Sequence, residues 1–368
     1  MINPPPLEMR LGLSSSQAFR TPLPLPFRLG RGIIIARMDG GNGRQAKAGK
    51  DVRLASTARG QAGLLKRLSG FAGRIALLGL HHLAKRVPLP VLYRVGEQLG
   101  KMAYRLSRRY RTVAERNLQM AYGDSLTGEQ RRQMVQQVFI HFAKSLMEFL
   151  VGDGLSPDDL RRLVTLVGEE HLQWCLQQGK GTLIITAHYG NWEMAARFLT
   201  QCRGYILNVV ARDADDTATT VLVNRIREQG GYHVIPRGQA VRAVLQALKR
   251  NELVALLPDQ NAGDVFVPFF GRLAGTVAGP ALLALRSGAP LLPVFCTRQP
   301  DNTYLFEILP PFMVQPSGNK ERDVTETMAR LNAIIEQQIR KHPSQWLWLH
   351  NRWKTRPPEE VYATSTAD

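Results

Sequence analysis

The sequence predicts an α/β protein in which a central mixed β-sheet is flanked by helices, with a basic helical region before it. After Gly181, short apolar runs typical of buried strands alternate with longer helical segments, the order expected of a layered α/β domain. Residues 61–150 instead repeat apolar residues at three- to four-residue spacing, which indicates helices. With 368 residues, 44% of them hydrophobic, the chain is long enough to bury a sizeable core.

Composition divides the chain into four parts. Residues 1–60 are rich in Pro, Gly and basic residues without a lasting apolar period. We expect a disordered extension there, because such a segment buries too little surface to offset its ordering entropy. Residues 61–150 are expected to form a basic, amphipathic, membrane-associating region, and residues 151–357 an α/β domain whose core continues into that region. Residues 358–368 are expected to be a flexible tail.

The positive charge is concentrated in the first third of the chain. Residues 1–120 hold 22 of the 48 Lys and Arg but only 5 of the 30 Asp and Glu, and the net charge is +18. This predicts attraction to a polyanion, such as an anionic membrane surface, an acidic carrier protein or nucleic acid. The most apolar stretch, Leu68–Leu83, contains Arg74, His81 and His82, so it fits a helix lying on a membrane better than one crossing it.

The expected elements follow the apolar pattern in order. Thr127 can cap a helix over Gly128–Leu150, because Gln130 stands at the third position of a capping box. The expected strands are Thr182–Ala187, Tyr205–Ala211, Leu253–Leu257, Leu291–Cys296 and Tyr304–Leu309. The expected helices beyond Gly181 are Asn191–Cys202, Thr217–Gln229, Gly238–Arg250, Gly279–Ser287 and Arg322–Lys341.

The segment Thr186–Glu193 carries the strongest local signal for chemistry. His188 ends a buried strand, at the edge where open α/β sheets place their ligands, and Gly190 permits a sharp turn before Asn191 caps the next helix. An imidazole there can take a proton from a hydroxyl, while Glu193 in the first helical turn folds back and fixes its tautomer. The alternative is a structural His beside an ordinary first-turn Glu.

A polar loop after Leu257 leads into an apolar run that ends at Gly271. The functional interpretation is one wall of an apolar groove with polar groups at its mouth, and the alternative is a loop with a hydrophobic edge. The candidate substrate contacts in this stretch are Asp259, Gln260, Gly263 and Phe269. Thr276 follows, before a helix from Gly279 whose N-terminus can receive an anion or a polar headgroup.

The stretch Trp346–Pro357 interleaves Trp with Arg and Lys. Indole rings favour the boundary between oil and phosphate, and the same pattern can stack the bases of a single-stranded nucleic acid. A packed C-terminal segment with a solvated basic edge is the plainest interpretation. The candidate binding cations here are Arg352, Lys354 and Arg356.

Together, these segments resemble the bacterial lipid A biosynthesis lauroyl/myristoyl acyltransferase family, part of the lysophospholipid acyltransferase-like superfamily. The resemblance runs from Leu64 to Pro357 and rests on several segments in the family's order. They are Arg116-Asn117-Leu118, HYGNWE at 188–193, Val210-Ala211-Arg212, PDQNAG and VFVPFFG within 258–271, Thr276 with the Gly279 helix, Ser287-Gly288-Ala289-Pro290, and WLHNRWKTRP at 348–357.

The resemblance implies a glycerol-3-phosphate acyltransferase-like fold and transfer of a fatty acyl chain from an acyl-ACP or acyl-CoA thioester to a hydroxyl of a lipid A precursor. It places the protein at the cytoplasmic face of the inner membrane, held peripherally or by a single N-terminal anchor. It carries His188 over as general base, Glu193 as its partner and Arg212 as the group that stabilises the oxyanion. Asn191 and Trp192 join the expected substrate contacts. No cofactor and no metal are implied.

Two alternatives remain open at this point. One is an acyltransferase with another acceptor, such as a phosphatidylinositol mannoside or a lysophospholipid, because the donor chemistry is shared. The other is a non-catalytic basic protein that binds membranes or nucleic acid, whose binding would be salt-sensitive and indifferent to His188. The sequence holds no recognised nucleic-acid-binding signature, so nucleic acid is not expected as a partner.

Overall fold

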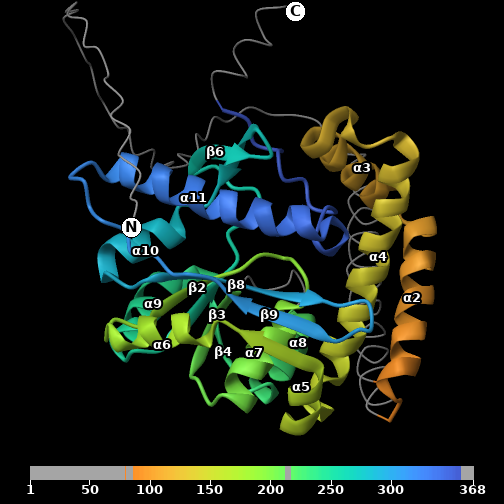
Figure 1. Cartoon of the computed structure of the whole chain (residues 1–368), viewed down its shortest axis with the longest axis horizontal. Coiled ribbons are helices and arrows are strands. Elements are labelled where there is room, and N and C mark those ends of the chain that lie inside the picture. Colours follow the sequence, from red (N-terminus) through yellow and green to blue (C-terminus); the bar gives the residue numbers. More distant parts are fainter. Residues whose placement is uncertain (1–78, 80–85, 212–216, 358–368) are drawn as a thin grey trace, which may run out of the picture. The chain divides into compact units, whose positions relative to one another are not determined.

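The computed structural model describes residues 79, 86–211 and 217–357. The chain falls into two units, Met1–Gly60 and Gln61–Asp368, and every described residue belongs to the second (Figure 1). The predictions made for residues 1–60, for most of Leu68–Leu83, for Arg212 and for residues 358–368 lie outside the described residues.

The basic region contributes three long helices, α2 (Leu89–Leu106), α3 (Arg108–Tyr122) and α4 (Gly128–Val151). The capping box predicted for Thr127 and Gln130 is confirmed, because each side chain accepts a hydrogen bond from the other residue's backbone amide. Helices α2 and α4 lie side by side (Figure 1). Glycine permits this approach, since a Cβ at position 100 would sit 2.5 Å from the Cα atom of Ile140.

A seven-stranded sheet forms the centre of the α/β domain, with the strand order β1-β9-β8-β2-β5-β3-β4. Its strands are β1 (Val164–Val167), β2 (Thr182–Ile185), β3 (Leu207–Ala211), β4 (His233–Pro236), β5 (Leu253–Leu256), β8 (Leu291–Arg298) and β9 (Tyr304–Ile308). All neighbours are parallel except β8 and β9. The predicted mixed sheet is confirmed. The two edge strands β1 and β4, and the separate antiparallel hairpin of β6 (Val265–Phe269) and β7 (Arg272–Thr276), were not predicted.

Helices cover both faces of this sheet. The set consists of α5 (Pro157–Leu163), α6 (Glu169–Gln177), α7 (Trp192–Arg197), α8 (Thr217–Gln229), α9 (Ala240–Lys249), α10 (Gly279–Ser287) and α11 (Lys320–Lys341). Side chains alternate between the faces with the period of two that strands impose. Ile184 packs into the layer of α5, α6 and α7, whereas its neighbours Leu183 and Ile185 pack into the layer of α9, α10 and α11.

Helix α7 starts beside a buried ion pair that joins α4 to the sheet. The Arg298 guanidinium on β8 donates to both carboxylate oxygens of Glu148 on α4, at 2.6 and 2.9 Å. Asn191, the N-cap of α7, donates to the same carboxylate at 2.8 Å and accepts from the Met194 amide. The Glu148 and Arg298 side chains are 1% and 7% exposed, so each charge depends on the other for its solvation.

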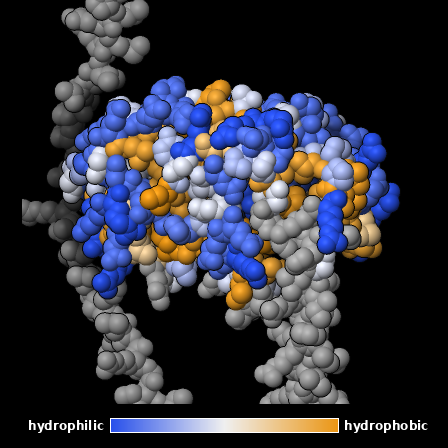
Figure 2. All heavy atoms as spheres, turned by 90° about the horizontal axis from the view of Figure 1, so that it is seen from below, coloured by the Kyte–Doolittle hydropathy of each residue, from blue (hydrophilic) through white to orange (hydrophobic). Residues whose placement is uncertain are grey.

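In the part of the chain that the structure describes, no helix has the length and apolarity needed to cross a membrane. Figure 2 shows one face of the molecule, on which apolar residues gather in separate patches among hydrophilic ones.

We expect Glu148→Ala to be strongly destabilising, because it leaves the Arg298 charge buried without its partner. Removing one member of a buried pair costs about 3–5 kcal/mol. The measurement is the free energy of unfolding in urea, with Glu129→Ala as control, since Glu129 lies on the same helix and pairs with Arg132 at the surface. A Glu148→Ala protein as stable as the control variant would contradict this account of the scaffold.

Candidate active site

The site forms where two neighbouring parallel strands end at the same edge of the sheet. Strands β2 and β5 are paired in register, with Ile185 opposite Leu256. His188 follows the last residue of β2 by three positions, and Asp259 follows the last residue of β5 by three. The register therefore carries these two side chains to the same level, at the carboxyl edge where α/β sheets place their ligands.

Asp259 holds His188 through both carboxylate oxygens. Its Oδ1 lies 2.8 Å from His188 Nδ1, and its Oδ2 accepts from the His188 backbone amide at 2.9 Å and from the Trp346 indole at 2.8 Å. Burial opposes ionisation of this side chain, which is 1% exposed. Attraction to the His188 ring in its protonated form and these hydrogen bonds outweigh that cost, and the pKa of Asp259 is lowered. An ionised carboxylate only accepts hydrogen bonds, so Nδ1 of the neutral ring carries the proton.

The other ring nitrogen, Nε2, is not bonded to Asp259 and can accept a hydrogen bond. The side-chain amide of Gln260 donates toward His188 Nε2 at 3.3 Å, a contact that fits an unprotonated Nε2. The Trp192 ring stands edge-on to the imidazole with 5.2 Å between centroids. His188 is 24% exposed and lines a cavity, so its ring is accessible from that cavity.

The turn after His188 is fixed from several sides. Gly190 has φ of +57°, and a Cβ there would lie 2.0 Å from the Cys296 carbonyl oxygen, so only glycine fits. His141 on α4 contacts the Gly190 carbonyl through Nε2 at 3.0 Å. Burial lowers the pKa of His141 to about 3, which keeps this ring neutral. The C-terminal segment completes the support, since the Leu347 amide donates to the His188 carbonyl at 3.0 Å.

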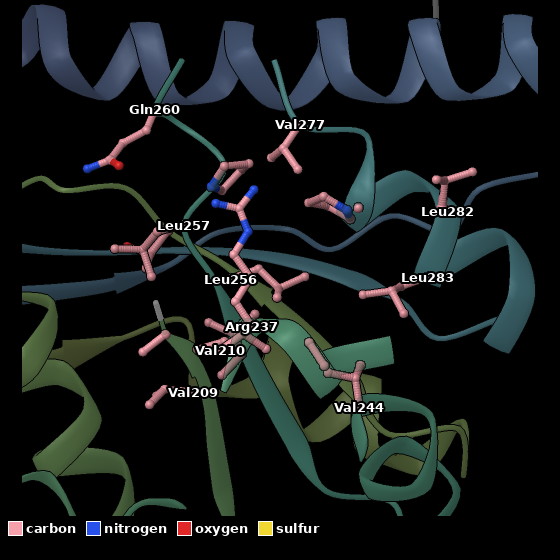
Figure 3. Close-up of a pocket in the computed structure, with 18 of the residues that line it drawn as sticks. Val209, Val210, Arg237, Val244, Leu256, Leu257, Gln260, Val277, Leu282 and Leu283 are labelled. Carbon is pink, nitrogen blue, oxygen red and sulfur yellow. The ribbon is translucent and has the colours of Figure 1, made fainter. Parts of the chain in front are cut away.

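A cavity of about 1090 Å³ opens at this edge of the sheet. Its lining comes from both layers of the domain: Ala195, Ala196, Leu199 and Leu207 from one, and Val210, Val244, Leu256 and Leu283 from the other. Figure 3 shows the labelled members of the lining around the ends of β3 and β5 and beside α10. The volume exceeds the range of about 300–1,000 Å³ that is usual for small-molecule pockets, so it has room for long apolar chains.

The predicted contact between Glu193 and His188 is wrong. The buried Glu193 carboxylate accepts from the Arg227 guanidinium at 2.6 Å, from the Tyr232 hydroxyl and from the Trp192 indole at 3.2 Å. Burial disfavours the Arg227 charge, but Glu193 outweighs it and the pKa of Arg227 is raised. The first turn of α7 thus directs Glu193 along the cavity wall, where it pairs with Arg227, and the imidazole takes Asp259 instead.

The other predicted site residues divide into two groups. Trp192, Glu193 and Gln260 line the cavity together with His188. Asn191 is buried as the helix cap, Asp259 is covered by its three donors, and Phe269 and Thr276 are fully buried. Arg352 is also fully buried and donates to the Gly275 carbonyl and the Thr276 hydroxyl. Burial lowers the pKa of Arg352 to about 10. These buried side chains hold the site together and are not placed to contact a substrate.

Three residues predicted to contact substrate do not line the cavity. They are Gly263, Lys354 and Arg356. The N-terminus of α10, predicted to receive an anion, is occupied from within the chain, since Asp264 accepts from the Ala278 amide at 3.1 Å.

Sequence reasoning missed the cations that do line the cavity: Arg227, Arg237, Arg286 and Lys320. They come from four separate elements, and nothing in their local sequence distinguishes them from surface residues. Within the described residues, no group of three His, Cys, Asp or Glu is placed to hold a metal ion.

Comparison with known proteins gives one consistent family. The family model described as bacterial lipid A biosynthesis acyltransferase matches residues 66–355, a range that includes His188 and Asp259. The lipid A biosynthesis lauroyltransferase of Escherichia coli (strain K12) is 32% identical over 286 residues, which cover 76% of this chain and 90% of that protein. The palmitoleoyltransferase of the same strain is 30% identical over 292 residues, covering 77% and 91%. A phosphatidylinositol mannoside acyltransferase of Mycobacterium tuberculosis (strain CDC 1551 / Oshkosh) is 30% identical over 192 residues, covering 50% and 58%.

The lowered pKa of Asp259 predicts a pH-dependent contribution to stability. Its ionised form is stabilised in the folded state, so this contribution is present above the unfolded-state pKa of about 3.9 and is lost as pH falls through the lower folded-state pKa. We expect Asp259→Asn to be less stable than the parent at pH 7, and the gap to narrow in acid. The measurement is the free energy of unfolding in urea for parent and variant, from pH 7 down to acid pH. Asp124→Asn is the control, because Asp124 is exposed. A gap that stays constant down to acid pH would contradict the assignment.

Proposed function

The chain belongs to the bacterial lipid A biosynthesis acyltransferase family and is an acyltransferase, and we propose that it moves a fatty acyl chain from a thioester donor to a hydroxyl of a lipid A precursor, with His188 as general base. The observation that carries this proposal is the His188–Asp259 pair at the head of a largely apolar cavity. The donor is an acyl-ACP or an acyl-CoA, both of which present the same thioester.

The reaction begins with the acceptor hydroxyl. The hydroxyl gives its proton to His188 Nε2 as its oxygen attacks the thioester carbonyl, and Asp259 stabilises the imidazolium that forms. The tetrahedral intermediate then collapses: the new C–O ester bond remains, the C–S bond breaks, and the proton on Nε2 passes to the departing thiolate. The pair thus needs no covalent acyl-enzyme, because the same nitrogen serves both half-steps.

The negative charge that develops on the carbonyl oxygen is stabilised by a hydrogen-bond donor. The resemblance assigns this role to Arg212, the residue directly after β3. A guanidinium can meet an oxyanion with two N–H groups, and such stabilisation acts on the transition state more than on bound substrate. We therefore expect Arg212→Ala to lower turnover more than it weakens binding of the donor.

The lining of the cavity supports a fatty acyl donor. Ala195, Ala196, Leu199 and Leu207 are each less than 9% exposed, and they form an apolar wall between α7 and the sheet. An acyl chain placed against them is removed from water, which favours binding by about 0.8 kcal/mol per buried CH₂. The ACP or CoA portion of the donor stays outside the cavity, and the thioester lies at His188.

The acceptor has one specific alternative. The similarity to a phosphatidylinositol mannoside acyltransferase covers half of this chain, so a mannoside acceptor would use the same donor chemistry. Relatives named for lipid A biosynthesis match three quarters of the chain, which favours the lipid A precursor.

The basic N-terminal helices fit a position at the cytoplasmic face of the inner membrane. Val91, Val95, Met102 and Leu106 on α2 are 41–76% exposed, and Arg94 and Arg105 lie on the same helix. Basic side chains near anionic lipid gain about 1 kcal/mol each. This combination supports peripheral association of the described part of the chain.

The decisive experiment is an acyl-transfer assay on detergent-solubilised protein. Acyl-ACP and acyl-CoA donors are offered with Kdo-lipid IVA, a phosphatidylinositol mannoside or a lysophospholipid as acceptor. We expect transfer to the lipid A precursor, its loss in a folded His188→Ala variant, and a fall in kcat of about 10²–10⁴-fold in Asp259→Asn. Transfer to the mannoside alone would identify a different acceptor and leave the proposed mechanism in place. Parental activity in His188→Ala would overturn the mechanism.

A further inference from the structure

Three basic side chains line the cavity without a partner. Arg237 precedes α9, Arg286 lies in the last turn of α10, and Lys320 begins α11. Among the residues that the structure describes, none of the three forms a salt bridge or a side-chain hydrogen bond. Figure 3 shows the Arg237 side chain extending into the cavity below Val277. The fourth lining cation, Arg227, differs because Glu193 neutralises it.

The acidic side chains on the described lining are already engaged. Glu193 holds Arg227 and Tyr232, and the Asp323 carboxylate accepts from the Ser317 amide at 3.1 and 3.2 Å. Because Glu193 offsets Arg227, the three other cations face the single carboxylate of Asp323, and the described lining keeps a net positive charge. Two guanidinium groups and an ammonium that line the same cavity suit a phosphate, which Arg binds in a bidentate manner and Lys as a point charge.

The apolar surface between α9 and α10 gives the second observation. Val241 and Leu282 are 57% and 37% exposed, and both line the cavity beside the buried Val244 and Leu283. We name the part of the cavity lined by these four residues the α9–α10 groove. Val241 and Leu282 are exposed to solvent there, whereas the wall of Ala195, Ala196, Leu199 and Leu207 is buried. An open apolar groove flanked by unpaired cations is complementary to an anionic amphiphile.

We propose that Arg237, Arg286 and Lys320 form a phosphate-binding subsite at the α9–α10 groove, and that its occupant is a phosphorylated lipid acceptor. The inference rests on the proposed function for the identity of the reaction. It adds where the acceptor binds and that a phosphate group on it is recognised. One apolar chain of the acceptor lies in the groove, its phosphate contacts the three cations, and its hydroxyl reaches His188.

The geometry favours the acceptor over the donor as the occupant. The two substrates must approach His188 together, and the buried apolar wall suits a single acyl chain withdrawn from water. The α9–α10 groove exposes apolar side chains to solvent, which suits a lipid that enters from a membrane surface. The other basic candidate, Arg352, is buried and bonded to Gly275 and Thr276, so it is not available to a phosphate.

Binding of decyl phosphate tests the subsite without any need for catalysis. The affinity of the full chain for decyl phosphate and for decanol is measured by calorimetry, below the concentration at which the amphiphile forms micelles. We expect the triple variant R237Q/R286Q/K320Q to bind decyl phosphate at least about tenfold more weakly, since each lost contact is a charge-assisted hydrogen bond. Decanol binding should stay unchanged.

The charge-matched control is R116Q/R242Q/K249Q, three exposed basic residues that are not part of the cavity lining. This variant should bind decyl phosphate like the parent. Equal affinity of the parent and the R237Q/R286Q/K320Q variant for decyl phosphate would overturn the subsite, as would equal losses in both triple variants.

Steady-state kinetics then identify the substrate that uses the subsite. The R237Q/R286Q/K320Q variant should raise KM for the phosphorylated acceptor about tenfold and leave KM for the donor unchanged. A rise in the donor KM alone would overturn the acceptor assignment. If the parent protein transfers no acyl group at all, the proposed function fails, while the decyl phosphate measurement still decides the subsite independently.

Discussion

The arrangement of the site depends on one buried carboxylate. Asp259 can remain ionised without solvent because three donors, the His188 ring, the His188 amide and the Trp346 indole, satisfy its oxygens. That charge fixes the imidazole with Nδ1 toward the protein and Nε2 toward the cavity. An ion buried with fewer partners would neutralise instead, and the ring would lose both its orientation and its tautomer.

Distant parts of the chain converge to maintain this contact. The C-terminal segment supplies Trp346 and the Leu347 amide, and helix α4 supplies His141 and Glu148, which hold the turn and cap of the helix after β2. Trp346, Trp348, Trp353 and Arg352 are buried, and they pack and bond within the scaffold.

Local patterns predicted the strand that leads to His188, the turn at Gly190 and the capped helix, because each of these depends on neighbours in sequence. The His188–Asp259 contact joins positions that lie 71 residues apart, and it follows from β2 lying beside β5, which no local pattern specifies. Glu193 was the nearest carboxylate along the chain, but Arg227 on α8 and Tyr232, the residue before β4, donate hydrogen bonds to it. In the same way, Arg352 was predicted to bind substrate, and only the packing of the fold shows that it is enclosed.

The orientation of His188 can be measured directly. In protein labelled with ¹⁵N-histidine, and with His188 assigned through a His188→Gln variant, proton–nitrogen correlation spectra of the neutral ring report which nitrogen carries the proton. We expect a protonated Nδ1 and an unprotonated Nε2. A proton on Nε2 with a bare Nδ1 would contradict it, because Asp259 would then hold no donor from the ring and Nε2 could not accept a proton from an acceptor hydroxyl.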